Sequence, residues 1–141
     1  MTTRSLTQKK LRSLPWPKAL LRGEYLTLEE TYKVGQLLAE RIYRNDRSHS
    51  HGRRPNSLRA LCEVIPNTSA PKLVRAIQVY EVCAKLGLTP PFGFSHAKAG
   101  HFYRMWELSK PKQETYLKRI EKLGLSVEQF KRELRGQNKK S

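Results

Sequence analysis

Four polar residues with hydrogen-bonding side chains recur at three-residue spacing near the start of one predicted helix: Ser69, Lys72, Arg75 and Gln78. Residues three apart are neighbours on a helix surface, so these side chains are expected to lie together, away from the apolar stripe. Arg and Gln can each form two parallel hydrogen bonds with one base edge, and a helix N-terminus favours a phosphate. This chemistry is recognition of a nucleic acid, with these four residues as candidates for reading bases.

Basic residues elsewhere in the chain are candidates for holding the phosphate backbone. They fall in three places: the N-terminal segment, the residues just before the predicted helix pair, and a helix after it. The candidates are Lys9, Lys10, Arg12, Arg53, Arg54, Lys98 and Arg104. Contacts of this kind position a protein on DNA but carry no sequence information.

The residues that would position this surface form a short helix, a tight turn and a longer helix. Ser57 and Ser69 are suited to cap the two helices, and Gly87 to end the second. The expected apolar stripes are Leu58, Leu61, Cys62 and Ile65 on the first helix, and Leu73, Ile77, Tyr80 and Ala84 on the second. The pattern predicts a helix-turn-helix whose second helix is offered to a DNA groove, although all-α proteins that bind no DNA contain similar pairs.

Further helix signals flank this pair. Thr27 with Glu30 forms a capping-box pattern that opens a helix to about residue 44, and Ser126 with Gln129 repeats the pattern near the C-terminus. Two more helices are predicted from Ser95 and from Pro111. The expected fold is therefore all-α, a compact bundle of five to six helices containing a helix-turn-helix.

The charge balance favours a polyanionic partner. The chain has 141 residues, which is enough for one domain, with 28 Lys and Arg against 12 Asp and Glu and a formal net charge of +16. Nucleic acid is the first expectation. A membrane is not expected as a partner, because no apolar run approaches the roughly 18 residues that a spanning helix requires.

No catalytic or metal-binding pattern emerges from the sequence, so we expect neither an enzyme nor a cofactor. His49 and His51 lie in a polar loop without further ligands at suitable spacing, and solvated side chains are the expected state. Cys62 and Cys83 are expected to be small buried hydrophobes of a reducing compartment, with a disulfide between them as the alternative. The expected location is the cytoplasm, in association with the nucleoid.

The first 26 residues are expected to be a basic, flexible arm. Residues 1–23 contain six Lys or Arg and no acid, and Pro15 and Pro17 forbid one continuous helix. An arm that follows the DNA backbone, a solvated leader and an organelle transit peptide are the three interpretations. Residues 27–135 would then form the helical DNA-binding domain, and residues 136–141 a disordered tail.

The second half of the chain resembles ParB-type partition proteins and their KorB-type relatives. The resemblance covers about residues 57–134. It depends on Ser95, His96, Pro111, Gln113, Gly124, Leu125, Ser126 and Val127, and on Ser69 with Leu73 at the start of the second helix of the pair. It implies a helical DNA-binding domain that acts alone or with an unknown protein partner. A homodimer is a separate expectation, because one helix contacts only a few base pairs and two-fold symmetric sites are common.

The chain departs from that family in its turn and its domains. The segment IPNTS is one residue longer than the usual turn, and no nucleotide-binding domain with an arginine-rich motif precedes it, so CTP-dependent clamping is not carried over. The sequence predicts a double-stranded DNA-binding protein of transcription regulation, plasmid partition or a mobile element.

Two other classes of function remain as alternatives. One is an RNA-binding or ribosome-associated protein, with Trp16, Tyr103 and Tyr116 as candidates for stacking on bases. The other is an adaptor that binds an acidic protein partner.

Overall fold

The computed structural model describes residues 8–43 and 57–140, and every regular element in these stretches is a helix. The α-helices are α1 (Gln8–Ser13), α2 (Lys18–Leu21), α3 (Leu28–Gln36), α4 (Leu58–Val64), α5 (Ala70–Leu86), α6 (Ala99–Arg104), α7 (Lys110–Leu123) and α8 (Val127–Lys140), and α3 continues into the π-helical segment η1 (Leu37–Ile42). The all-α class is confirmed. The expected number of helices was too low, because α1 and α2 form within the segment predicted as an arm.

Most helix ends follow the local signals in the sequence, but α6 begins at Ala99 and not at Ser95, where its start was predicted. The Thr27 hydroxyl accepts the Glu30 N–H at 3.1 Å, and the Glu30 carboxylate accepts the Thr27 N–H at 2.9 Å, which completes the predicted capping box. Ser126 and Gln129 form the same reciprocal pair at the start of α8. Gly87 ends α5 in the left-handed region with φ of 71°, where a residue with a Cβ atom would be strained.

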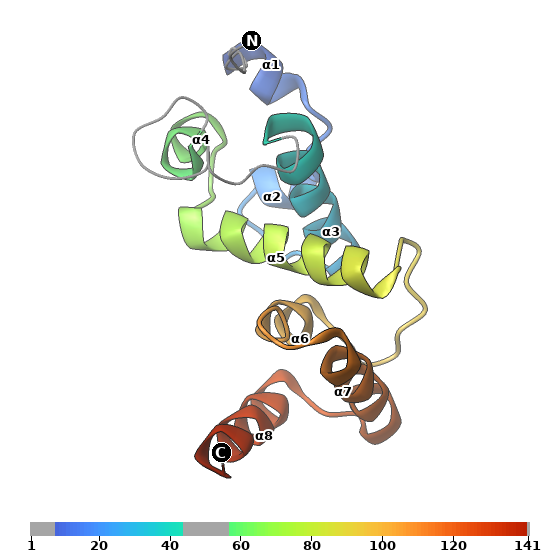
Figure 1. The fold of residues 1–141 in the computed structure, drawn as a ribbon. Coiled ribbons are helices and arrows are strands. Elements are labelled where there is room, and N and C mark those ends of the chain that lie inside the picture. Colours follow the sequence, from blue (N-terminus) through green and yellow to red (C-terminus); the bar gives the residue numbers. More distant parts are fainter. Residues whose placement is uncertain (1–7, 44–56, 141) are drawn as a thin grey trace.

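Helix α5 lies between two hydrophobic clusters. Figure 1 shows it crossing the middle of the molecule, with α1–α4 above it and α6–α8 below it. The N-terminal cluster takes Leu73, Ala76 and Ile77 from the first half of α5, together with side chains from α1 to α4. The C-terminal cluster takes Val79, Val82 and Cys83 from the second half, with side chains from α6 to α8.

The first half of α5 packs into one cluster and the second half into the other. The single apolar stripe predicted for α5 is therefore wrong in its second half. Leu73 and Ile77 are buried as expected, but Tyr80 is only half-buried and Ala84 is exposed. The stripe predicted for α4 holds at Leu58, Leu61 and Ile65, whereas Cys62 is half-buried. Apolar residues at helical spacing predict one packing face of a helix, but they do not indicate that a second cluster packs against another face.

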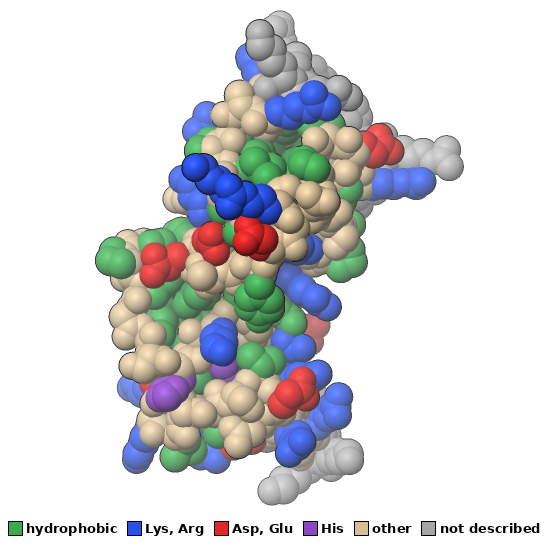
Figure 2. Space-filling view, turned by 180° about the vertical axis from the view of Figure 1, so that it is seen from behind, with side chains coloured by type: hydrophobic (Ala, Val, Ile, Leu, Met, Phe, Trp, Pro, Cys, Tyr) green, Lys and Arg blue, Asp and Glu red, His purple; other side chains and the backbone are tan. Residues whose placement is uncertain are grey.

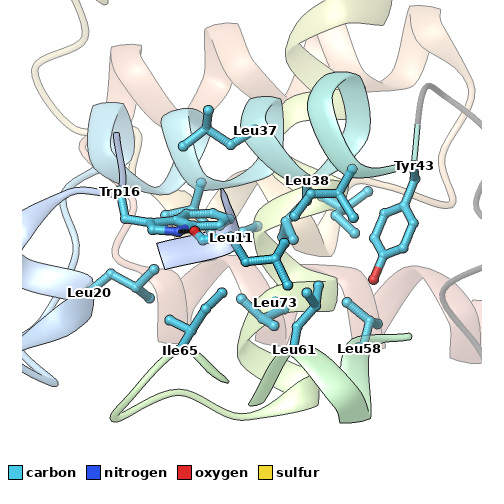
Figure 3. Close-up of a cluster of buried hydrophobic side chains, with 14 residues drawn as sticks. Leu11, Trp16, Leu20, Leu37, Leu38, Tyr43, Leu58, Leu61, Ile65 and Leu73 are labelled. Carbon is cyan, nitrogen blue, oxygen red and sulfur yellow. Dashed lines mark hydrogen bonds between the residues drawn. The ribbon is translucent and has the colours of Figure 1, made fainter. Parts of the chain in front are cut away.

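The segment between residues 8 and 26 differs from the flexible arm predicted for it. Leu11, Trp16 and Leu20 are buried in the N-terminal cluster, and the Trp16 indole N–H donates to the Leu11 carbonyl at 2.7 Å. Figure 3 shows the indole beneath Leu37, with Leu20 and Ile65 on its other side. At the other end of the chain α8 continues to Lys140, so the backbone of residues 136–140, predicted as a disordered tail, is helical.

Helices α3 and α5 approach so closely that a glycine is required at the crossing. A Cβ atom on Gly35 would lie 2.1 Å from the Ala76 carbonyl oxygen and 2.8 Å from the Tyr80 Cβ. Beside this crossing the Tyr80 hydroxyl donates to the Glu40 carboxylate at 2.6 Å, and burial together with that carboxylate raises the pKa of Tyr80. The α3–α5 pair therefore forms a fixed centre against which both clusters pack.

Candidate nucleic-acid interface

The turn between α4 and α5 is anchored to the N-terminal segment. Ile65 is buried at its start, and Asn67 adopts a left-handed conformation with φ of 59°, which Asn tolerates better than most residues. The Asn67 side-chain amide donates to the Leu21 carbonyl at 2.8 Å. The Ser69 hydroxyl then accepts the Lys72 N–H at 3.4 Å and caps α5, as predicted. The direction of the first turns of α5 is thus fixed by the Asn67–Leu21 hydrogen bond and by the Ser69 cap.

The four residues predicted to read bases lie along the first half of α5 with different exposure. Ser69 and Arg75 are exposed, whereas Lys72 and Gln78 are half-buried. Within residues 8–43 and 57–140, neither Lys72 nor Arg75 forms an ion pair with a carboxylate. Among the described residues, both positive charges therefore lack a carboxylate partner in an ion pair.

A groove runs beside the start of α5 and brings some of these residues together with α6. Its volume is about 470 Å³, and its charged and aromatic lining consists of Glu24, Tyr25, Lys72, Arg75, Tyr103 and Arg104. We call it the α5–α6 groove. Ser69 and Gln78 do not line it. Three cations and one carboxylate give the groove a net positive charge, which suits an anionic ligand.

Helix α6 is fixed next to this groove by a buried histidine. His101 accepts the Lys98 N–H through Nδ1 at 2.9 Å, so Nε2 carries the proton that is donated to the Leu125 carbonyl, also at 2.9 Å. Burial lowers the pKa of His101, and the nearby charges of Lys98 and Arg104 lower it further, against the raising effect of backbone hydrogen bonds at Leu125 and Ser126. This geometry gives His101 a structural role at the start of α6.

A carboxylate from α7 holds the chain that leads into α6. The Glu121 carboxylate accepts the backbone N–H groups of Ser95, His96 and Ala97, each at 2.7 Å. Burial raises the pKa of Glu121, but these three donors, with the charge of His96, outweigh burial and lower it overall. The side chains of α6 that face the groove are thereby supported by α7 and by the turn before α8.

The residues predicted to hold phosphates do not form one surface in the described part of the chain. Arg104 lines the α5–α6 groove, whereas Lys98 and Lys10 are exposed and do not line it. Arg12 lies beside Trp16, Leu21 and the end of α4. Lys9 belongs to α1, but its side chain lies outside the description, as do Arg53 and Arg54 altogether.

Positive charge is spread along one face of the molecule. Figure 2 shows Lys and Arg side chains from one end of the molecule to the other on the face drawn there, with Asp and Glu among them. Such a distribution supports electrostatic attraction to a polyanion at many points of this face, so the groove is distinguished by its shape and by the residues that line it, and not by charge alone.

Two features of the groove were not predicted from the sequence. Tyr25 lines the groove and is 90% exposed. It was not predicted as a site residue, because a single tyrosine between a helix end and a capping box belongs to no sequence pattern. Tyr103 was considered only for stacking on bases, yet both Arg75 and Arg104 contact its ring. The other stacking candidates, Trp16 and Tyr116, are buried.

The cysteines and histidines form no second candidate site. Cys62 and Cys83 are free thiols, which answers the alternative of a disulfide between them. Over the described ranges, no three His, Cys, Asp or Glu side chains lie close enough to hold a metal ion, and His49 and His51 fall outside those ranges.

Comparisons with known proteins add no further assignment. The chain matches no family model, no curated protein and no solved structure. No helix among the described residues is both long enough and apolar enough to cross a membrane.

Proposed function

We propose that the chain binds double-stranded DNA through a helix-turn-helix formed by α4 and α5. The observation that carries the proposal is the capped start of α5, where the exposed Arg75 and the half-buried Lys72 have no carboxylate partner among the described residues. An Arg near the start of such a helix is placed to reach a base edge in the major groove. The net charge of +16 supports attraction to the DNA backbone.

Roles in transcription regulation, in partition of the ParB and KorB type, or in a mobile element are the biological settings that we propose. A nucleoid-associated protein in the cytoplasm fits all three. Two copies binding a two-fold symmetric site would extend the few base pairs that one helix contacts. Selection of bound sequences from a random duplex pool tests binding, specificity and site symmetry in one experiment.

Replacement of Arg75 by Ala tests the base-reading role on the selected site. We expect a loss of about 1–3 kcal/mol on that site and a smaller loss on random duplex DNA. An equal loss on both DNAs would place Arg75 among the backbone contacts. Affinity should fall with salt at a log–log slope of about −5 if some six phosphates are neutralised.

A charge-matched pair of lysine variants separates the start of α5 from general electrostatics. Lys72→Ala should weaken binding and make the salt slope less steep by about one. Lys118→Ala removes the same charge from an exposed position on α7, beside Leu86 at the opposite end of α5. We expect that control to leave the slope nearly unchanged, and equal effects of the two variants would argue against the start of α5 as the interface.

Binding of single-stranded RNA is the second candidate, and the exposed ring of Tyr25 is the observation that favours it. An exposed aromatic ring beside cations is a suitable surface for stacking a splayed base. The burial of Trp16 and Tyr116 removes the other two rings expected for this role. Competition between duplex DNA and single-stranded RNA decides between the candidates, and Tyr25→Ala should weaken only the RNA complex.

A further inference from the structure

Two arginines from different helices contact the ring of Tyr103. The guanidinium carbon of Arg75 on α5 lies 5.1 Å from the ring centroid, and that of Arg104 on α6 lies 4.6 Å from it. Both distances are within the range in which a cation is attracted to an aromatic face. Arg104 also donates to the Gly100 carbonyl at 3.0 Å and to the Tyr103 hydroxyl.

These contacts order two side chains that would otherwise be mobile. An Arg side chain in solvent samples many rotamers, and two guanidinium groups near each other repel. The separation of the two guanidinium carbons cannot exceed the sum of their distances to the shared ring centre. Because the described residues supply no ion pair for either arginine, the ring of Tyr103 is the group that both arginines share.

Glu24, the acidic residue at the groove, does not take over the role of the Tyr103 ring. Glu24 lines the groove, but among the described residues its ion pair is with Arg22, at 3.7 Å and with both side chains largely exposed. A DNA phosphate beside the two arginines would supply the missing negative charge. Guanidinium groups suit phosphate oxygens because they present paired N–H donors in a fixed geometry.

We propose that Tyr103 is a positioning residue for DNA recognition, which presents Arg75 to a base edge and Arg104 to the adjacent phosphate. The DNA-contacting surface then includes α6 as well as α5, and the spacing between the two contacts is set before DNA arrives. This inference rests on the proposed DNA-binding function. Its physical basis is preorganisation, since side chains that are already ordered lose less entropy on binding.

The test compares Tyr103→Leu with Tyr103→Phe on the selected duplex. Leu removes the aromatic face but keeps an apolar side chain, whereas Phe keeps the face and loses only the hydroxyl. We expect Tyr103→Leu to raise Kd about tenfold, from the loss of two cation–π contacts, and Tyr103→Phe to stay within about twofold of the wild type. A purely structural role would lower the melting temperature of Tyr103→Leu without changing the Kd of the folded protein.

A double-mutant cycle on the two arginines tests the same inference without altering Tyr103. Because Arg75 and Arg104 act as one unit, we expect Arg75→Ala with Arg104→Ala to weaken binding by less than the product of the two single effects. Independent effects, or equal Kd values for Tyr103→Leu and the wild type, would overturn the inference and leave the proposed function standing. Failure of the wild-type protein to bind any duplex at low salt would overturn both.

Discussion

Replacement of Gly35 by Ala tests the α3–α5 crossing on which both clusters depend. The added Cβ would lie 2.1 Å from the Ala76 carbonyl oxygen and 2.7 Å from its carbon, distances that real Cβ atoms essentially never show. Because those atoms belong to the backbone of α5, a side-chain rotation cannot relieve the contact. The two helices have to separate or shift.

The expected magnitude combines a packing cost with a gain in helix propensity. Overpacking in a well-packed interior costs about 1–3 kcal/mol and sometimes more, and here the obstacle is backbone, so the upper part of that range applies. Ala in place of Gly in a helix returns up to about 1 kcal/mol. We therefore expect a net loss of about 2 kcal/mol in the free energy of unfolding, or roughly 8 °C in melting temperature.

Gly136→Ala is the matched control, because it makes the same substitution in α8 where an added Cβ would meet nothing within 4 Å. It should leave the protein as stable as the wild type or raise the free energy of unfolding by up to about 1 kcal/mol. Thermal and urea unfolding followed by circular dichroism measure both variants. If Gly35→Ala were as stable as Gly136→Ala, the close approach of α3 and α5 would be refuted.

Further predictions concern titration and thiol reactivity. Because the pKa of Glu121 is lowered in the fold, its ionised carboxylate stabilises the protein above the unfolded pKa of about 4.5, and this stabilisation is lost as the pH falls through the folded pKa. Glu121→Gln should therefore lower the free energy of unfolding by about 1–2 kcal/mol near neutral pH and by less in acid. Glu107→Gln, the control, should change it little. Glu133, whose pKa is lowered by the hydrogen bond from Arg119, titrates in the same window, so the measured quantity is the difference between variant and wild type. Burial raises the pKa of Cys62, and that of Cys83 to about 12, so a thiol reagent at neutral pH should modify half-buried Cys62 slowly and buried Cys83 only on unfolding. Equal rates for the two thiols in the folded protein would contradict their different burial.

Local features of the fold were predictable from the sequence, because each depends on a few neighbouring residues. The capping boxes at Thr27 and Ser126 and the cap at Ser69 depend on side chains that reach the backbone within three positions. The end of α5 at Gly87 was predictable because the residue that ends a helix often adopts the left-handed conformation that glycine favours. These signals place the start of α5 correctly.

Features that join distant parts of the chain were not predictable in this way. Trp16 stands among basic residues and prolines, and its burial depends on η1 and on the end of α4, which the local sequence does not specify. The contact of Arg75 with Tyr103 joins α5 to α6 across the connector between them. Composition indicated the positive charge but not the groove that gathers part of it.

The anchoring of Asn67 has a practical consequence for shortened versions of the protein. The side-chain amide of Asn67 donates a hydrogen bond to the carbonyl of Leu21. The Cβ atom of Asn67 lies 3.1 Å from the position that a Cβ on Gly23 would occupy. Deleting the first 26 residues would remove this bond and would uncover Ile65 and Leu37, which Trp16 and Leu20 now shield from water. A fragment that starts at residue 27 would therefore misalign α5 and tend to aggregate, so weak DNA binding by such a fragment would say nothing about Arg75.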